Sequence, residues 1–275
     1  GTAYIHSVLV QERRGLLRVW NLSLICATFA LTILGTFITR SGILASVHAF
    51  SAGNFGGWLL VFFSIIVVVA VALIFWRGER LRSPGGMDSP LSREGAFLAN
   101  NLAFAVFAFV VLLGTVFPLI VEAFQNRQIS VGAPYFEKMS MPIGFTLLFL
   151  MAVAPLLPWR KAGRELLVHR VEWPAWGAAL SIVIAVAVGA RGALPLLGFS
   201  MAGFAGTSAV RQLALSARRH RFRGFLGRKN GGMVVHIGVI LLAVGFIASS
   251  SFVDQASISL TTGERVRIAE TDVTY

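Results

Sequence analysis

The sequence predicts an all-α protein that crosses a membrane several times, and three observations support this. Of its 275 residues, 56% are hydrophobic and only 13% are charged, with a mean hydropathy of +0.77. An ordinary soluble domain is far less apolar. The apolar residues gather into runs of about 20, the length that a helix needs to cross a bilayer. The basic residues lie between those runs, which argues against a nucleic-acid-binding protein despite a formal net charge of +12.

About seven transmembrane helices are expected, together with part of an earlier one. Seven runs that contain no Asp, Glu, Lys or Arg are residues 20–39, 57–76, 96–120, 142–158, 173–190, 193–210 and 232–250. The short apolar stretch from Tyr4 to Val10 is interpreted as the tail of a preceding helix. Together these segments predict a helical bundle over residues 1–250.

The Lys and Arg residues predict which loops share a side of the membrane. Four loops hold 18 of the 24 basic residues, namely 11–19, 77–95, 159–172 and 211–231. The loops that alternate with them, at 40–56, 121–141, 191 and 251–275, hold the other six. Because basic loops stay in the cytoplasm, the first group is predicted to be cytoplasmic, and the second group, including the C-terminus, periplasmic.

Two predicted periplasmic segments have structure of their own. Around residues 41–56, the apolar side chains Ile43, Leu44, Val47 and Phe50 share one helical stripe, which indicates a short amphipathic helix on the membrane surface. Residues 251–275 are expected to begin a β-rich periplasmic domain. There the alternation at Ile258 and Leu260, a turn over 261–264, and the alternation at Val266 and Ile268 predict a β-hairpin.

Two histidines, His6 and His236, lie inside predicted apolar helices, where an ionisable side chain is costly and is a candidate for function. Both lie within about 10 Å of the predicted cytoplasmic boundary. Their helices run in opposite directions, so the two imidazoles could clamp the iron of a b-type haem inside a bundle. The alternative is that both rings are hydrogen-bonded helix-packing residues.

On the opposite side, His48 lies too far away to share that iron, because a bilayer core is about 30 Å thick. Arg40 ends a span on the predicted periplasmic side and could bind an anionic group such as a haem propionate, or serve as an interfacial anchor. The single cysteine, Cys26, leaves no disulfide or cysteine zinc site to be built from this chain alone.

A long motif carries a resemblance to a known family. The run Gly35-Thr-Phe-Ile-Thr-Arg-Ser-Gly-Ile-Leu-Ala-Ser-Val-His48-Ala-Phe closely resembles a signature of the cytochrome c maturation protein F family, the haem lyases of the bacterial system I pathway. The resemblance covers essentially the whole chain. It continues at residues 3–7, 98–101, 113–115, 129–136 and 232–238.

The resemblance implies roles for the three histidines. His6 and His236 correspond to the axial ligands of an intramembrane b-type haem, and His48 corresponds to one of two periplasmic histidines that hold the incoming haem as catalytic ligands. The family's second periplasmic histidine and its tryptophan-rich haem-binding segment are expected upstream of Gly1. The chain is therefore interpreted as a fragment that is not a competent lyase alone.

The resemblance also implies a location and a set of partners. The expected location is the bacterial inner membrane, as a multi-pass protein. The expected partners are a haem chaperone, apocytochrome c with its thiol-reducing subunit, quinol as electron donor, and membrane lipid, with no nucleic acid. The implied activity joins apocytochrome thiols to haem vinyl groups, while the b-type haem reduces the incoming iron.

Two rival functions belong to other classes. A proton- or solute-coupled secondary transporter could use the intramembrane histidines as a relay, but the predicted spans lack Asp and Glu and show no inverted repeat. A purely structural scaffold could dock cytochromes through the C-terminal hairpin. Only the haem-binding function requires a pigment, so an absorption spectrum separates it from both rivals.

Overall fold

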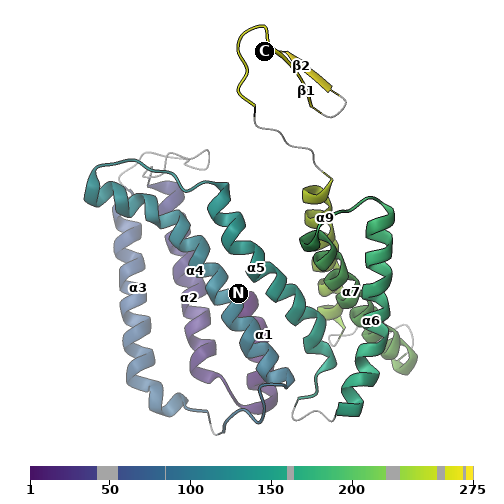
Figure 1. Ribbon diagram of the computed structural model, residues 1–275. Coiled ribbons are helices and arrows are strands. Elements are labelled where there is room, and N and C mark those ends of the chain that lie inside the picture. The colour runs from purple at the N-terminus through teal and green to yellow at the C-terminus, as the bar shows by residue number, and fades with distance from the viewer. Residues whose placement is uncertain are drawn as a thin grey trace. The chain divides into compact units, whose positions relative to one another are not determined.

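The computed structural model describes residues 1–41, 55–83, 85–159, 164–220, 230–252, 258–268 and 271–274. It divides into two compact units, unit 1 over Gly1–Gly163 and unit 2 over Arg164–Tyr275, and Figure 1 shows the helices of each. Within the described ranges, seven helices are long and apolar enough to cross a membrane. The prediction of an all-α polytopic membrane fold is confirmed.

Unit 1 is a row of helices with a short one in the middle. Its elements are α1 (Thr2–Arg14), α2 (Arg18–Arg40), α3 (Phe55–Arg77), the 3₁₀ turn η1 (Gly78–Leu81), α4 (Arg93–Gln125), α5 (Ala133–Val153) and the 3₁₀ turn η2 (Ala154–Leu156). α2 packs on α3, α4 packs on α5, and α1 packs on both α2 and α4 (Figure 1). The 13-residue α1 therefore joins the two helix pairs.

Local sequence explains how α1 and α4 are bounded. Gly15 ends α1 in the left-handed region, at φ 68°, and its N–H donates to the carbonyl of Gln11. This is the usual role of glycine after a helix. α4 starts at Ser92, whose hydroxyl accepts a hydrogen bond from the N–H of Gly95, as an N-cap side chain does.

Several helices begin or end outside the apolar runs from which the spans were predicted. α5 begins at Ala133 and runs through Pro142, where the span was expected to start. In unit 2, α6 (Arg164–Ala187) likewise begins before Trp173 and runs through Pro174. Proline removes one backbone hydrogen bond without ending a helix whose packing holds it. α7 (Ala193–His220) extends ten residues beyond the predicted end at Val210.

The described part of unit 2 contains α6, α7, α9 (Gly231–Ser251) and a β-hairpin. α6 and α7 form the predicted pair with a tight turn, in which Gly189 and Gly192 take positive φ angles of 101° and 91°. The two helices approach closely where Gly177 faces Gly203, and the Ser181 hydroxyl donates to the carbonyl of Phe199 across the interface at 2.9 Å. Small residues permit such close approach between membrane helices.

A β-hairpin is present near the C-terminus, but the residues predicted to form its two strands were wrong. β1 (Arg265–Ile268) pairs antiparallel with β2 (Thr271–Thr274), and residues 258–260 form no strand. The turn over 261–264 exists, but it precedes β1 instead of joining two strands. Glu264 accepts hydrogen bonds from the Thr261 N–H and hydroxyl, both at 2.9 Å, which lowers the pKa of its carboxyl group. The turn is therefore stabilised by hydrogen bonds between its own residues.

The predicted amphipathic segment around 41–56 lies mostly outside the described residues. Its two ends are described, because Ser41 follows α2 directly and Gly56 belongs to the first turn of α3. They lie close together, since a Cβ atom at Gly56 would come within 2.8 Å of the Ser41 Cβ.

Replacing Gly203 with alanine should destabilise the α6–α7 pair. A Cβ atom there would lie 2.6 Å from the Gly177 carbonyl oxygen and 2.7 Å from the Ser181 Cβ, so the helices must separate at a cost of about 1–3 kcal/mol. Gly206→Ala is the matched control, because a Cβ atom on Gly206 meets nothing within 4 Å. Thermal unfolding in detergent should show a lower Tm for G203A only, and equal Tm values would contradict the close approach.

Candidate functional site

His6 lies on α1 beside the stripe of that helix which faces its neighbours. Ala3, Ser7 and Val10 make up the stripe and are at most 7% exposed, at the i, i+4, i+7 spacing of one helix face. His6 is half-buried next to it. The ring therefore belongs to the edge of the α1–α4 contact.

Three side chains of α4 hold the imidazole of His6. The ring stacks on Phe97, with centroids 5.6 Å apart and planes 24° apart, and on Phe104, at 6.4 Å and 14°. Asn100 lies between these two phenylalanines on the same face of α4, and its Nδ2 is 3.1 Å from Nδ1 of His6. Two near-parallel rings and one hydrogen bond thus restrict both the plane and the rotation of the imidazole.

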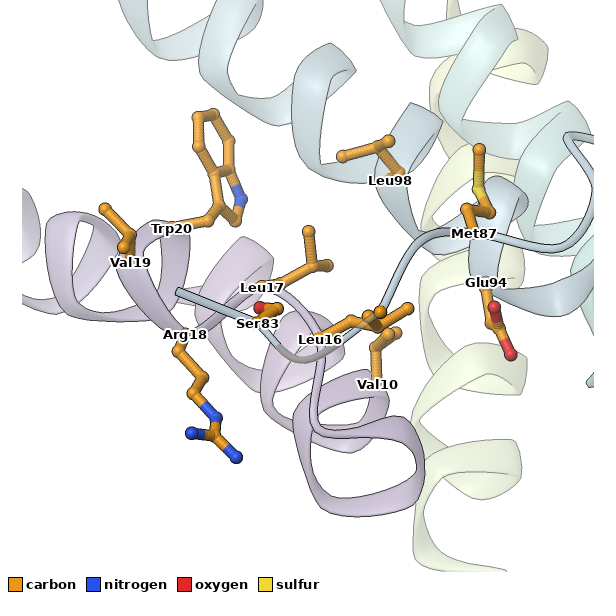
Figure 2. Close-up of a pocket in the computed structure, with 11 residues that line it drawn as sticks. Val10, Leu16, Leu17, Arg18, Val19, Trp20, Ser83, Met87, Glu94 and Leu98 are labelled. Carbon is orange, nitrogen blue, oxygen red and sulfur yellow. The ribbon is translucent and has the colours of Figure 1, made fainter. Parts of the chain in front are cut away.

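A pocket of about 340 Å³ lies further along the same helices (Figure 2). Most of its lining is apolar and comes from α1, α2, α4, the turn between α1 and α2, and the linker between α3 and α4, with Arg18, Ser83 and Glu94 as polar members. Its volume is at the lower end of the range for small-molecule sites. Val10 lines the pocket and follows His6 by four residues, about 6 Å along a helix.

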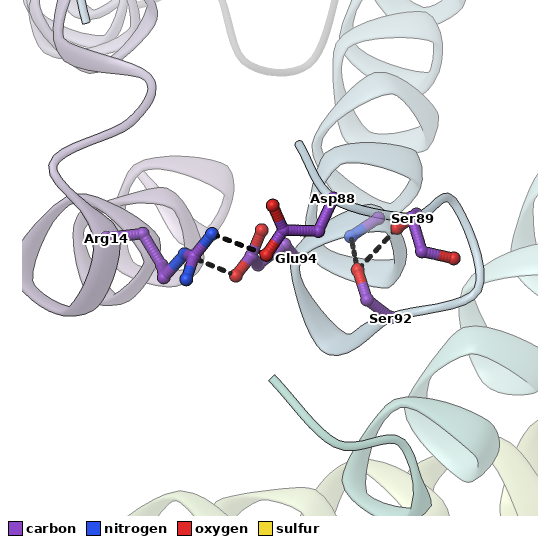
Figure 3. A network of polar contacts seen from close by, with 6 residues as sticks. Arg14, Asp88, Ser89, Ser92 and Glu94 are labelled. Atoms are coloured by element: carbon purple, nitrogen blue, oxygen red, sulfur yellow. Dashed lines mark hydrogen bonds and ion pairs between the residues drawn. The ribbon is translucent and has the colours of Figure 1, made fainter. Parts of the chain in front are cut away.

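An ion cluster fastens α1 to α4 beside this pocket (Figure 3). The Arg14 guanidinium contacts Glu94 through Nε at 2.7 Å and Asp88 through Nη2 at 2.8 Å. The Glu94 side chain is 2% exposed, whereas that of Asp88 is 40% exposed. The Arg14–Glu94 pair is therefore the buried part of the cluster, where loss of one partner leaves an uncompensated charge.

The three basic loops of unit 1 that were predicted to share a side meet at one end of the unit. Arg93 donates from Nε to the carbonyl of Leu157 at 3.1 Å and from Nη2 to the carbonyl of Pro155 at 2.8 Å. The Trp159 ring lies near two guanidinium groups, those of Arg13 at 5.7 Å and Arg93 at 5.5 Å. Residues from all three loops thus contact one another, as the alternation of charge predicted for this unit.

Buried polar side chains occur on α1, α2 and α4 of unit 1. Ser7 and Asn101 are fully buried, and the Ser7 hydroxyl and both amide atoms of Asn101 have no hydrogen-bond partner among the described residues. Asn21 is 3% exposed and donates from Nδ2 to Oε1 of Gln11 at 2.5 Å. Groups of this kind are rare in native interiors and call for an explanation.

His236 belongs to unit 2. The ring is half-buried on α9, next to Val235, which is 63% exposed. A Cβ atom built on Gly232 or Gly238 would meet no atom of unit 2 within 4 Å. Within the described part of unit 2, these glycines therefore do not serve close packing against another helix.

The remaining predicted site residues lie at helix ends or outside the described ranges. Arg40 is the last residue of α2 and its side chain is exposed. His48 lies in the segment 42–54, outside the described residues. The resemblance-based roles of both remain predictions.

Sequence reasoning did not single out Asn100 and Glu94 as site residues. A signal for Asn100 was available, because Asn100 and Asn101 are adjacent amides inside an otherwise apolar run. The partners were not predictable, since His6 is 94 residues away from Asn100 in the chain. Glu94 and Arg14 carried a weaker signal, as opposite charges in two loops predicted to share a side.

Removal of Arg14 should destabilise unit 1 strongly. Arg14→Ala leaves the buried Glu94 carboxylate without its ion-pair partner, at a cost of about 3–5 kcal/mol. Adding Glu94→Gln to that variant should recover part of the loss, because the unpaired charge is gone. The control Asp88→Asn removes the exposed arm of the cluster and should change stability by less than about 1 kcal/mol. Detergent Tm values check this, and a double variant no more stable than R14A would contradict it.

Comparisons with known proteins agree on one family. No family model matches the chain. The chain is 34% identical to cytochrome c-type biogenesis protein CcmF of Pseudomonas fluorescens, over 98% of this chain and 41% of that protein. It is 32% identical to CcmF of Escherichia coli strain K12, over 100% of this chain and 42% of that protein. The chain therefore spans about two fifths of the length of these relatives.

A solved structure gives the same result at the level of fold. The chain matches a structure titled "Cytochrome c Heme Lyase CcmF" with a TM-score of 0.64 and 31% identity, over 91% of this chain and 37% of that one. Because the likeness in sequence and the likeness in fold each extend over nearly the whole chain, this chain belongs to the CcmF family of cytochrome c-type biogenesis proteins.

Proposed function

We propose that this chain forms the haem-handling part of a cytochrome c haem lyase in the bacterial inner membrane. His48 binds the incoming haem at the periplasmic face for thioether attachment to apocytochrome c, and His6 and His236 would hold the iron of a resident b-type haem. The main support is the match of nearly the whole chain to a structure titled as a haem lyase.

The surroundings of His6 suit an iron ligand. A ligating imidazole binds metal through one nitrogen and is held by a hydrogen bond at the other. The Nδ2 atom of Asn100 lies 3.1 Å from Nδ1 of His6. With the amide turned so that Oδ1 accepts a proton from Nδ1, Nε2 is the nitrogen that would bind the iron. The flanking Phe97 and Phe104 rings keep the imidazole plane fixed.

The surroundings of His236 also suit a large planar ligand. Gly232 lies one helical turn before His236 on the same face of α9, and a Cβ atom there would meet no described atom of unit 2 within 4 Å. A macrocycle needs such space beside its axial ligand. When bound, the b-type haem would supply one-electron reduction of the incoming haem iron, with electrons from quinol.

At the periplasmic face, the chain contributes binding and orientation. His48 holds the incoming haem together with a second histidine from another part of the lyase. Arg40 is exposed at the end of α2 and pairs with a propionate, since guanidinium groups bind carboxylates through charge-assisted hydrogen bonds. The partners are a system I haem chaperone, apocytochrome c and its thiol-reducing subunit. The basic loops of unit 1 that contact one another lie on the cytoplasmic side.

Loss of either intramembrane histidine should remove the resident haem. In the complete lyase purified from membranes, His6→Ala and His236→Ala should each lose most of the b-type haem absorption, because one axial bond to iron is gone. His169→Ala is the control, since the His169 side chain is 88% exposed in unit 2. An undiminished Soret band in H6A or H236A would refute the assignment.

Loss of the periplasmic histidine should separate the two haem functions. His48→Ala should reduce cytochrome c maturation to background while the b-type haem spectrum stays at the wild-type level, because the two haems have different ligands. Cytochrome c yield in cells and the spectrum of the purified lyase measure the two effects. Normal maturation in the H48A strain is the result that this role does not allow.

A further inference from the structure

The hydrogen bond between His6 and Asn100 determines which nitrogen of the imidazole can bind a metal. A neutral imidazole carries one N–H and one lone pair. An Asn100 amide that donates to Nδ1 places the imidazole proton on Nε2. The same amide, rotated by half a turn, presents Oδ1 to Nδ1, accepts its proton and leaves the Nε2 lone pair for iron.

We propose that Asn100 is the positioning residue of the His6 ligand, with its amide oxygen accepting the Nδ1 proton when iron is bound. The inference rests on the proposed haem ligation by His6. Asn100 acts through His6 and does not touch the iron itself. Its hydrogen bond holds Nε2 toward the metal and makes the imidazole a stronger electron donor, which favours ferric iron.

The environment of this pair explains why an amide serves well there. Phe97 and Phe104 are apolar and set the ring plane, whereas Asn100 is polar and distinguishes the two ring nitrogens by pairing with Nδ1. A carboxylate would add a charge inside the membrane, which is costly. The amide offers both a donor and an acceptor without charge, so it can pair with Nδ1 in the haem-free and haem-bound states.

Two substitutions at Asn100 should shift the reduction potential of the b-type haem in opposite directions. Asn100→Leu removes the acceptor, so the reduction potential of the b-type haem should rise and haem affinity should fall by about 10- to 100-fold. Asn100→Asp keeps the shape and strengthens the acceptor, so the potential should fall below that of the wild type. Redox titration and haem titration of the purified complete lyase measure both effects.

The neighbouring Asn101 provides the matched control. It is fully buried on α4, and its amide atoms have no hydrogen-bond partner among the described residues, so Asn101→Leu makes the same chemical change away from His6. The reduction potential of the b-type haem in N101L should equal that of the wild type. Equal shifts of the reduction potential in N100L and N101L would overturn the proposal. An unchanged potential in N100D would also overturn it. If N100L does not fold, the N100D measurement alone decides.

Failure of this inference is distinguishable from failure of the proposed function. If H6A keeps the b-type haem spectrum, His6 is not a ligand and the proposed function fails. If H6A loses the spectrum while N100L and N100D leave the potential unchanged, haem ligation stands and only the role of Asn100 is wrong.

Discussion

The contact between α1 and α4 is the constraint on which the rest of unit 1 depends. α1 has only 13 residues, yet it is the helix that packs on both α2 and α4. Its end is fastened by Arg14, which pairs with the buried Glu94 on α4 and with Asp88 in the linker before it. That pairing sets the register in which His6 meets Asn100. The orientation of the proposed iron ligand therefore follows from an ion pair at the other end of the same helix.

This contact contains more polar groups than stability alone would favour. Ser7 is fully buried beside His6 on α1, and the described residues offer its hydroxyl no hydrogen-bond partner. An apolar interface would be more stable in a membrane protein of this kind. Departures from local packing rules gather at functional sites, and this one adjoins His6 on α1. It agrees with a site at the contact between His6 and Asn100 that is kept for binding.

The sequence predicted the spans well because a charge-free run of about 20 residues has few other uses. It predicted helix ends poorly, since hydropathy reports the thickness of the hydrocarbon and not the length of the helix. α7, for example, continues to His220 through a basic, polar segment. The C-terminal strands shifted for a different reason, because the Glu264 carboxylate closes its own turn with Thr261 and β1 begins only after it.

The candidate site could also be predicted only in part from the sequence. His6 could be predicted, because an ionisable residue in an apolar run is conspicuous. Its partner could not, because pairing between helices that are distant in the chain depends on packing that periodicity does not encode.

The most direct test of iron ligation by His6 is pulsed electron paramagnetic resonance on the ferric complete lyase labelled with [¹⁵N]histidine. The account predicts couplings from two axial imidazoles in the wild type and from one in His6→Met, and two undiminished couplings in H6M would contradict it.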